Sequence, residues 1–100
     1  MANLLKETQE ILEEHNLSFE DIIWIGTTEY EIPIDVFIML ADDEYNDGFG
    51  CEEVNPDIVV AGDTWWLERA EYDGSEWWEF KTKPNRPNAV KNYKVKIFDK

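Results

Sequence analysis

The sequence predicts an α+β fold, in which two helices pack on a small antiparallel sheet of about four strands with a tryptophan-rich hairpin. Two stretches in the first half of the chain carry apolar residues at helical spacing. From position 58 onward, apolar and polar residues alternate instead, which is the period of a half-buried strand. The 100 residues are enough for one hydrophobic core, so we expect a single acidic domain over residues 1–100.

The first helix is expected to begin after Asn3 and to end near His15. Asparagine is a preferred N-cap residue, and Asn16 suits the left-handed conformation that often ends a helix. Four glutamates occupy the face opposite the apolar stripe, and those near the C-terminal end oppose the helix dipole. The helix therefore depends on the packing of its stripe, which consists of Leu4, Leu5, Thr8, Ile11, Leu12 and His15.

The middle of the chain predicts a strand, a short extended piece and a second helix. The β-branched run at residues 22–26 is typical of a central strand that is covered on both faces. Pro33 lacks an amide donor, so any strand over residues 30–34 has to lie at a sheet edge. Asp35 then caps a helix that reaches about Tyr45. The residues that this helix is expected to bury are Val36, Phe37, Leu40, Ala41 and Tyr45.

A hairpin is the strongest short-range prediction, because Asp73-Gly74 separates two alternating segments at residues 64–72 and 75–82. Residues 58–61 form a further strand before it. A three-residue bulged loop would shift the hairpin register by one and turn one strand over. With a two-residue loop, the cross-strand pairs are Trp65–Thr82, Leu67–Phe80 and Arg69–Trp78.

In the two-residue register, each pair of adjacent tryptophans is divided between the two faces of the hairpin. One face carries Trp65, Leu67, Trp78 and Phe80, and the other carries Trp66, Ala70, Tyr72 and Trp77. Two helices can cover one face of a small sheet. The other face is then either a binding surface, since tryptophan and tyrosine are enriched in interface hot spots, or a surface that other parts of the chain cover.

Charge divides the chain into an acidic body and a basic C-terminal segment. Residues 1–80 hold two basic and 22 acidic residues, a net charge of −20, whereas residues 81–100 have a net charge of +6. Pro84 and Pro87 bracket a linker in this segment, and residues 93–98 alternate as expected of an edge strand whose lysines discourage aggregation. The segment can alternatively dock on the acidic body.

The acidic body limits the possible partners. A globule of this size is roughly 30 Å across, and 30 Å of DNA duplex carries about 18 phosphate charges. The body thus matches the charge of a duplex segment of its own size, and it repels nucleic acid and anionic membranes. Two interpretations remain open, namely a charge that only keeps the domain soluble and a charge that selects a basic partner.

Catalytic, metal and cofactor signals are weak, so we expect no enzyme and no cofactor. A lone cysteine excludes an internal disulfide, and Cys51 beside two glutamates is a poor nucleophile. His15 belongs to the apolar stripe of the first helix. A calcium loop starting at Asp43 fails at its twelfth position, which is Val54 in place of glutamate. No apolar run is long enough to span a membrane, and we expect a cytoplasmic protein.

The stretch at residues 65–79, WWLERAEYDGSEWWE, resembles a stretch in small acidic accessory proteins of prophages from Gram-positive bacteria. Residues 21–26 and 45–50 resemble the same group, so the resemblance covers roughly residues 20–84. It implies no catalytic residue, because the group has no established activity to carry over. It implies a phage origin, and phage accessory genes often encode inhibitors of host defence or replication proteins, some of which mimic DNA.

These observations lead to two hypotheses of function. In the first, the protein is a non-enzymatic phage-type inhibitor that binds a basic nucleic-acid-binding host protein and occludes its nucleic-acid site. In the second, it is a structural or adaptor protein that forms a homodimer through the tryptophan-rich sheet face. In the first hypothesis the acidic partner-binding residues are Asp42, Asp43, Glu44, Asp47, Glu52, Glu53 and Asp57, and the aromatic anchors are Trp66, Tyr72 and Trp77.

Overall fold

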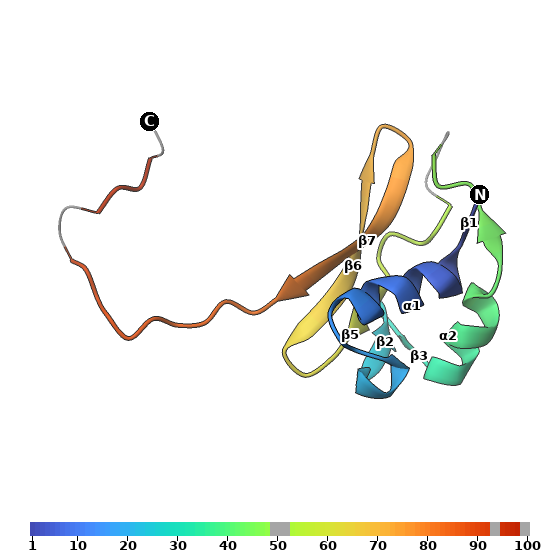
Figure 1. The fold of residues 1–100 in the computed structure, drawn as a ribbon, viewed down its shortest axis with the longest axis horizontal. Helices are drawn as coiled ribbons and strands as arrows, with labels where there is room; N and C mark the ends of the chain where they lie inside the picture. The colour runs from blue at the N-terminus through green and yellow to red at the C-terminus, as the bar shows by residue number, and fades with distance from the viewer. Residues whose placement is uncertain (49–52, 93–94, 99–100) are drawn as a thin grey trace.

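The computed structural model of the chain describes residues 1–48, 53–92 and 95–98. Over these residues the fold is α+β, as the sequence predicts, but it holds a five-stranded and a two-stranded sheet in place of one sheet of about four strands (Figure 1). The helices are α1 (Leu4–Glu14), α2 (Ile34–Ala41) and a 3-10 turn (Phe19–Asp21). The strands are β1 (Ala2–Asn3), β2 (Trp24–Gly26), β3 (Glu31–Ile32), β4 (Glu44–Tyr45), β5 (Val59–Ala61), β6 (Trp65–Tyr72) and β7 (Ser75–Thr82).

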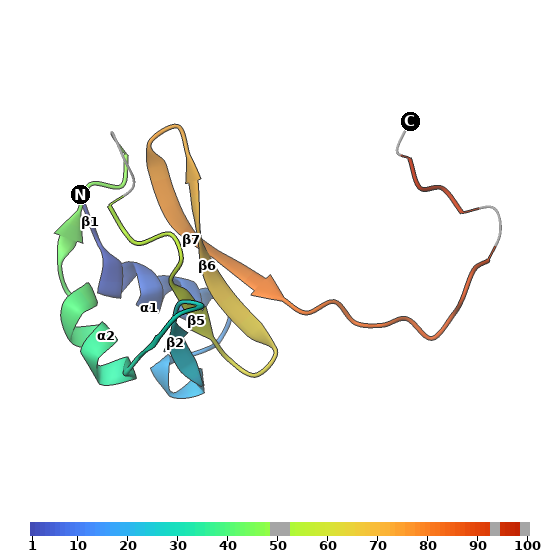
Figure 2. The ribbon, with the colours of Figure 1, turned by 180° about the vertical axis from the view of Figure 1, so that it is seen from behind.

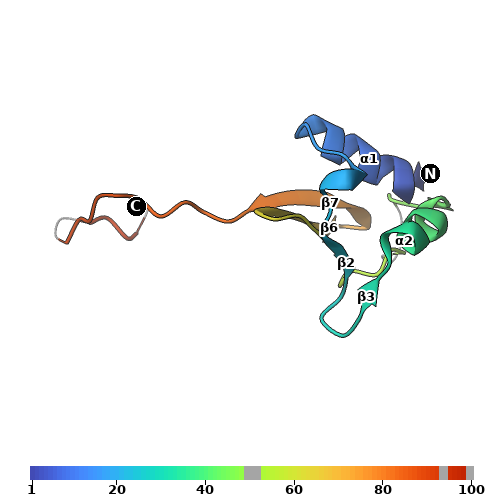
Figure 3. The same cartoon turned by 90° about the horizontal axis from the view of Figure 1, so that it is seen from below.

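The larger sheet has the strand order β3-β2-β5-β6-β7, and every neighbouring pair is antiparallel. The helix α1 lies on one face of this sheet above β6 and β7, and α2 lies beside it (Figure 3). The small sheet pairs β1 with β4 and so joins the start of α1 to the end of α2. The core between the layers consists of Leu12, Ile22, Ile25, Phe37, Ala41, Val60, Trp65, Leu67 and Trp78.

The first helix follows the sequence prediction. Asn3 caps it, because its side-chain oxygen accepts a hydrogen bond from the amide of Lys6 (2.9 Å). Asn16 has a φ of 59°, in the left-handed region, and ends the helix. The amide of Leu17 then donates to the carbonyl of Leu12 (2.9 Å), which turns the chain back onto the core.

The prediction that both faces of the strand at residues 22–26 are covered is wrong. Ile25 is fully buried, whereas Trp24 is 37% exposed and Ile23 is 61% exposed. In β2 successive side chains point to opposite faces of the sheet. Among the described residues no helix packs on the face that carries Trp24, so the apolar run at this point reflects an exposed aromatic surface and not a strand buried on both sides.

The prediction that Asp35 caps the second helix is wrong, because the helix begins at Ile34 with Pro33 as its N-cap. The helix is also shorter than predicted. It ends at Ala41, and the short strand β4 follows from Glu44. Tyr45 is buried as predicted, but from this strand and not from the helix. The prediction that Leu40 is buried is wrong, since its side chain is 66% exposed. The helical sequence pattern continues past Ala41, but there the chain pairs with β1 as the strand β4. This pairing joins distant parts of the chain.

The hairpin register predicted from Asp73-Gly74 is confirmed. Leu67 pairs with Phe80 and Arg69 with Trp78 across β6 and β7. Asp73 and Gly74 have φ values of 52° and 86°, so both loop residues adopt the left-handed conformation that a two-residue hairpin loop requires.

Beyond β7 the chain runs away from the body as an extended segment (Figures 1 and 2). Residues 83–92 and 95–98 are exposed and form no strand, in contrast to the predicted edge strand. Tyr93 and Lys94 lie outside the described residues. Pro84 and Pro87 restrict the residues before them to extended conformations, which favours a chain that continues outward after the hairpin.

Candidate functional site

The two faces of the β6–β7 hairpin differ in what covers them. The core face lies under α1, and its side chains are Trp65, Leu67, Arg69, Glu76, Trp78 and Phe80. No helix in the described part of the chain covers the other side, which we call the open face. Its side chains on the hairpin are Trp66, Glu68, Ala70, Tyr72, Trp77, Glu79 and Lys81, and the register extends it across β5 and β2 to Trp24.

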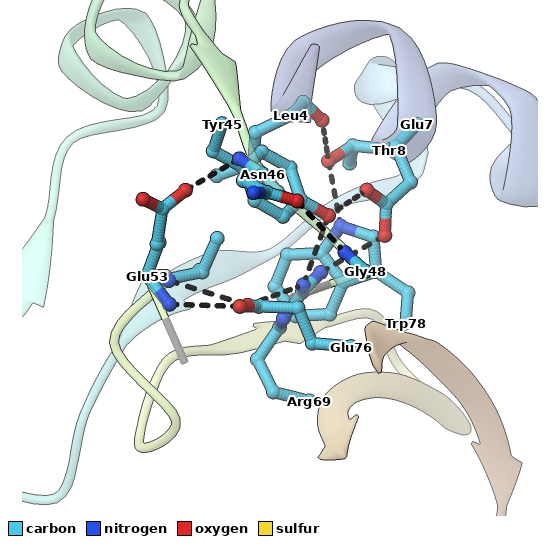
Figure 4. A network of polar contacts seen from close by, with 11 residues as sticks. Leu4, Glu7, Thr8, Tyr45, Asn46, Gly48, Glu53, Arg69, Glu76 and Trp78 are labelled. Carbon is cyan, nitrogen blue, oxygen red and sulfur yellow. Dashed lines mark hydrogen bonds and ion pairs between the residues drawn. The ribbon is translucent and has the colours of Figure 1, made fainter. Parts of the chain in front are cut away.

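Arg69 lies at the centre of a buried polar network beneath α1 (Figure 4). Its Nη1 donates to Glu7 Oε1 (3.0 Å), and its Nη2 donates to Glu76 Oε1 (3.0 Å) and to the hydroxyl oxygen of Tyr45 (3.1 Å). That hydroxyl donates in turn to the other carboxylate oxygen of Glu7. The guanidinium carbon lies 4.6 Å from the ring centre of Trp78. One cation therefore ties together α1, β4, β6 and β7.

Glu76 extends this network to the loop that precedes β5. Its carboxylate accepts from the backbone amides of Glu53 (2.7 Å) and Val54 (3.2 Å). Its own amide donates to the carbonyl of Asp47 (3.0 Å). The carboxylate of Glu76, which also binds Arg69, thus holds residues 53 and 54 against β7, and its backbone amide holds Asp47 there.

A second chain of hydrogen bonds joins the hairpin to the first turn of α1. The indole N–H of Trp78 donates to the hydroxyl of Thr8 (2.9 Å), and that hydroxyl donates to the carbonyl of Leu4 (2.7 Å). Thr8 is fully buried. The indole of Trp78 and the guanidinium of Arg69 are thus both bound to side chains of α1, which fixes the position of this helix over β7.

The electrostatics of the network keep its two central groups in one protonation state. Burial alone lowers the pKa of Arg69, but the hydrogen bond to Tyr45 and the charge of Glu7 outweigh it and raise that pKa overall. Burial and the hydrogen bond to Glu7 raise the pKa of Tyr45 above its ordinary value. The guanidinium is therefore charged and the phenol neutral across the physiological range.

Burial of Arg69 changes the balance of charge on the surface. Of the two basic side chains in residues 1–80, this one is hidden and paired with two carboxylates, which leaves Lys6 as the exposed one. Within the described part of residues 1–80, the carboxylates other than Glu7 and Glu76 are exposed or half-exposed, and Lys6 is the one exposed cation among them. The surface of the body is consequently more uniformly negative than the composition alone indicates.

An acidic groove of about 520 Å³ runs between α1 and the outer edge of β7. Two of its carboxylates, Glu7 and Glu76, are already paired with Arg69. Three other carboxylates of the groove form no ion pair with Arg69, namely those of Glu10 and Glu14 on α1 and of Asp47 opposite them. The groove is also lined by Lys6, Ile11, Trp77 and Trp78, and by residues 1–3. We call this feature the acidic groove.

The open face carries a second, more apolar hollow of about 590 Å³. Trp66 lies within it, and its indole N–H donates to Glu68 Oε1 (2.8 Å). Trp24 stands in the same cross-strand row, on β2. The residues that line this hollow are Trp24, Val59, Ala61, Gly62, Asp63, Thr64, Trp65, Trp66 and Lys83.

The structure divides the predicted acidic residues between two places. Asp47 lines the acidic groove, whereas Asp43, Glu44 and Glu53 line a smaller hollow of about 380 Å³. Asp43 has a local structural role as well, since its carboxylate accepts from the amide of Glu44 (2.9 Å).

The other three acidic candidates stand apart from the acidic groove. Asp42 accepts a hydrogen bond from the side chain of Asn3 (3.1 Å). Asp57 is exposed in the turn before β5. Glu52 lies outside the described residues.

The predicted aromatic anchors share the open face but not one hollow. Trp66 lies in the apolar hollow, and Trp77, which is 39% exposed, contributes to the acidic groove at the edge of β7. Tyr72 is 76% exposed next to the hairpin loop. Trp77 and Asp47 are thus an aromatic and an acidic candidate that the structure brings to one site.

Sequence reasoning missed both the Arg69 network and the acidic groove. A signal for the network exists, because Arg69 alternates with Leu67 and Trp65 on the apolar side of β6. A cation at such a position is buried only if carboxylates pair with it. Its partner Glu7 lies 62 residues away in the sequence, so the identity of the partner could not be read from spacing.

His15 packs against the hairpin. The ring of His15 stacks on Phe80, with 3.7 Å between the ring centres. Among residues 1–48, 53–92 and 95–98, no cluster of three or more His, Cys, Asp or Glu side chains is placed to hold a metal ion. Cys51 lies outside the described residues.

No protein family, curated protein or solved structure matches this chain. In the described part of the chain, no helix has the length and apolarity that crossing a membrane requires.

Proposed function

We propose that this protein is a non-enzymatic inhibitor that binds a basic, nucleic-acid-binding protein of the host cell and occludes the nucleic-acid site of that partner. The observation that carries the proposal is the acidic groove. Carboxylates there that form no ion pair with Arg69, on α1 and at Asp47, face the edge of β7 and its two tryptophans. The groove combines charge with shape, which a merely solubilising charge does not need.

The uniformly negative surface of the body supports the same proposal. Coulomb attraction between a body of net charge −20 and a partner's lysines and arginines accelerates association, and salt weakens it. The internal pairing of Arg69 removes the only cation of residues 7–80 from competition with a partner. A partner that normally binds phosphates would meet carboxylates at comparable density.

Aromatic side chains supply what charge alone does not. Charge without shape gives a promiscuous binder, because any basic surface satisfies it. Trp77 at the groove, with Trp66 and Tyr72 further along the open face, gives the amphipathic contact area that dominates many interfaces. The resemblance to prophage accessory proteins supplies the class of partner, a host defence or replication protein.

The proposal is tested by reversing charge inside and outside the acidic groove at equal net charge. The groove variant is Glu10→Lys with Glu14→Lys, and the control is Glu13→Lys with Glu29→Lys, two exposed positions that do not line the groove. Lysines near the C-terminal end of α1 complement the helix dipole, so both variants should fold. Each protein is used to capture partners from a host lysate at about 100 mM and about 500 mM salt.

The proposed function predicts one stoichiometric basic nucleic-acid-binding protein on the wild type and on the control, with less retained at high salt. The groove variant should retain at least about tenfold less, which corresponds to roughly 1.4 kcal/mol. Equal retention by the groove variant and the control would contradict a site at the groove, and capture of no protein at either salt would contradict the function itself.

The second candidate function is self-association through the open face. The observation that favours it is the apolar hollow around Trp24 and Trp66 on the open face, which further along β7 also carries the exposed Trp77. Light scattering on the wild type and on Trp66→Ser separates the two functions. A dimer that persists at high salt and disappears in the variant would support self-association, and a monomer at all salts would exclude it.

A further inference from the structure

The outer edge of β7 carries backbone groups that point away from the sheet. β7 is the last strand of the sheet and pairs only with β6. In an antiparallel ladder every second residue turns its N–H and C=O outward. Glu76 is one of these residues, because its amide bonds to the carbonyl of Asp47 outside the sheet. Trp78 and Phe80 follow at the same period, and no backbone partner binds their amides within the described residues.

This edge is also one wall of the acidic groove. The groove is bounded by Glu76, Trp77 and Trp78 on the strand and by Glu10 and Glu14 on the helix. The helix follows the strand obliquely, since Thr8 bonds to Trp78 and His15 stacks on Phe80. Unpaired strand edges recruit extended chains, and natural edges are usually blocked by a charge of the edge strand itself or by a covering segment.

We propose that this edge binds an extended basic segment of the partner, which adds to the sheet as a strand next to β7 with its cations facing α1. The inference deepens the proposed function, and rests on it, by naming the form in which the partner is recognised. Main-chain hydrogen bonds to Trp78 and Phe80 would supply affinity in this recognition mode, and the side chains would supply specificity.

The chemistry of the groove selects a basic occupant. Side chains on one side of a strand are about 6.8 Å apart, and Glu10 and Glu14 are separated by about 6 Å along the helix axis. Successive lysines on one side of an added strand can therefore each reach a carboxylate. The alternate side chains of the same strand would lie on the open face beside Trp77, which favours apolar residues at those positions.

The test uses the full chain and a defined probe, a heptapeptide in which four lysines alternate with three valines. Amide hydrogen exchange of Trp78 and Phe80 is followed by NMR as the peptide is added. In a control peptide of equal charge, proline replaces each valine, which removes every second amide donor and twists the backbone into a left-handed extended helix that does not pair as a strand.

At saturating lysine–valine peptide, exchange at both amides should slow at least about tenfold, and the proline peptide should leave it unchanged. The Glu10→Lys, Glu14→Lys variant should bind the peptide at least about tenfold more weakly than the Glu13→Lys, Glu29→Lys control. Binding that leaves both amides unprotected overturns strand addition. Amides that are already protected before peptide is added also overturn it, because the chain's own C-terminal segment then occupies the edge.

These results separate the inference from the function on which it rests. If the groove variant loses the lysate partner but the peptide never protects the amides, the partner binds by charge alone and strand addition is wrong. If neither effect is seen, both proposals fail.

Discussion

The two faces of the β6–β7 hairpin carry the same kinds of residue in opposite environments. Each has two tryptophans, at least one glutamate and one cation. On the core face the cation Arg69 is buried and bound to Glu7 and Glu76, whereas on the open face Lys81 is exposed and lies 3.9 Å from Glu79. Equal composition therefore does not mean equal energetic role.

What separates the faces is the cover that α1 provides. Under the helix, charged and polar atoms have lost water, so each needs a protein partner, and the network provides one for nearly all of them. On the open face Glu68 stands directly opposite Glu79, an arrangement that water tolerates and a buried site would not. The core face stabilises the fold, and the exposed tryptophans and the groove edge are the parts of the surface that the proposed function uses.

The two faces should differ most in unfolding free energy when the cation of each face is removed. Arg69→Leu leaves the buried carboxylate of Glu76 and the half-buried carboxylate of Glu7 without a counter-charge, which should cost about 3–5 kcal/mol of unfolding free energy. Lys81→Leu, the matched change on the open face, should change it by less than about 0.5 kcal/mol. Urea denaturation followed by tryptophan fluorescence measures both. Similar losses in the two variants would mean that the faces do not differ as described.

Smaller changes to one tryptophan on each face sharpen the same contrast. Trp78→Phe removes the hydrogen bond to Thr8 and leaves a gap beside Arg69, so it should cost about 1–3 kcal/mol. Trp77→Phe on the open face should cost less than about 0.5 kcal/mol. The double variant Thr8→Val, Trp78→Phe provides a check, because the loss should be less than additive if the hydrogen bond is the cause.

The pH dependence of stability tests the buried network alone. The pKa of Tyr45 is raised in the folded protein, so this phenol keeps its proton at a pH where the unfolded chain has lost it. Its contribution to stability is complete below about pH 10 and decreases as the pH rises further. Tyr45→Phe should remove this part of the alkaline loss in denaturation measured between about pH 8 and 11. An identical slope in the wild type and the variant would show that Tyr45 is not coupled to folding.

The smallest expected effect has the opposite sign. Glu79→Lys places a cation opposite Glu68 in place of a second anion, which should stabilise the hairpin by about 0.2–1 kcal/mol. Glu79→Gln should give part of that gain, since it removes the repulsion without adding an attraction. A loss of stability in both variants would indicate that Glu79 has a role on the open face that the structure does not reveal.

The parts of the fold that local chemistry determines could be predicted from the sequence. The cap at Asn3, the helix stop at Asn16 and the hairpin at Asp73-Gly74 depend on residues close in sequence, and all three are confirmed. The end of α2 was predicted too late because pairing of Glu44 with Asn3, some 41 positions apart, overrides the local helical pattern.

The candidate site was less predictable because it is assembled from distant segments. The carboxylates of the acidic groove come from α1, the segment after β4, and β7, and only the packed fold brings them to one strand edge. The sequence predicts partner-binding residues in the acidic stretch 42–47 because its charges are adjacent in sequence. In the structure Asp42 binds the side chain of Asn3, and Asp43 and Glu44 line another hollow. Of that stretch only Asp47 lines the groove.

The measurement that tests the central claim most directly is displacement of nucleic acid from the captured partner. A labelled duplex bound to that partner is titrated with this protein, and its fluorescence anisotropy is followed. The account predicts stoichiometric release by the wild type and by the Glu13→Lys, Glu29→Lys control, with at least about tenfold more of the Glu10→Lys, Glu14→Lys variant needed. A duplex that stays bound while this protein joins the complex would contradict occlusion through the acidic groove.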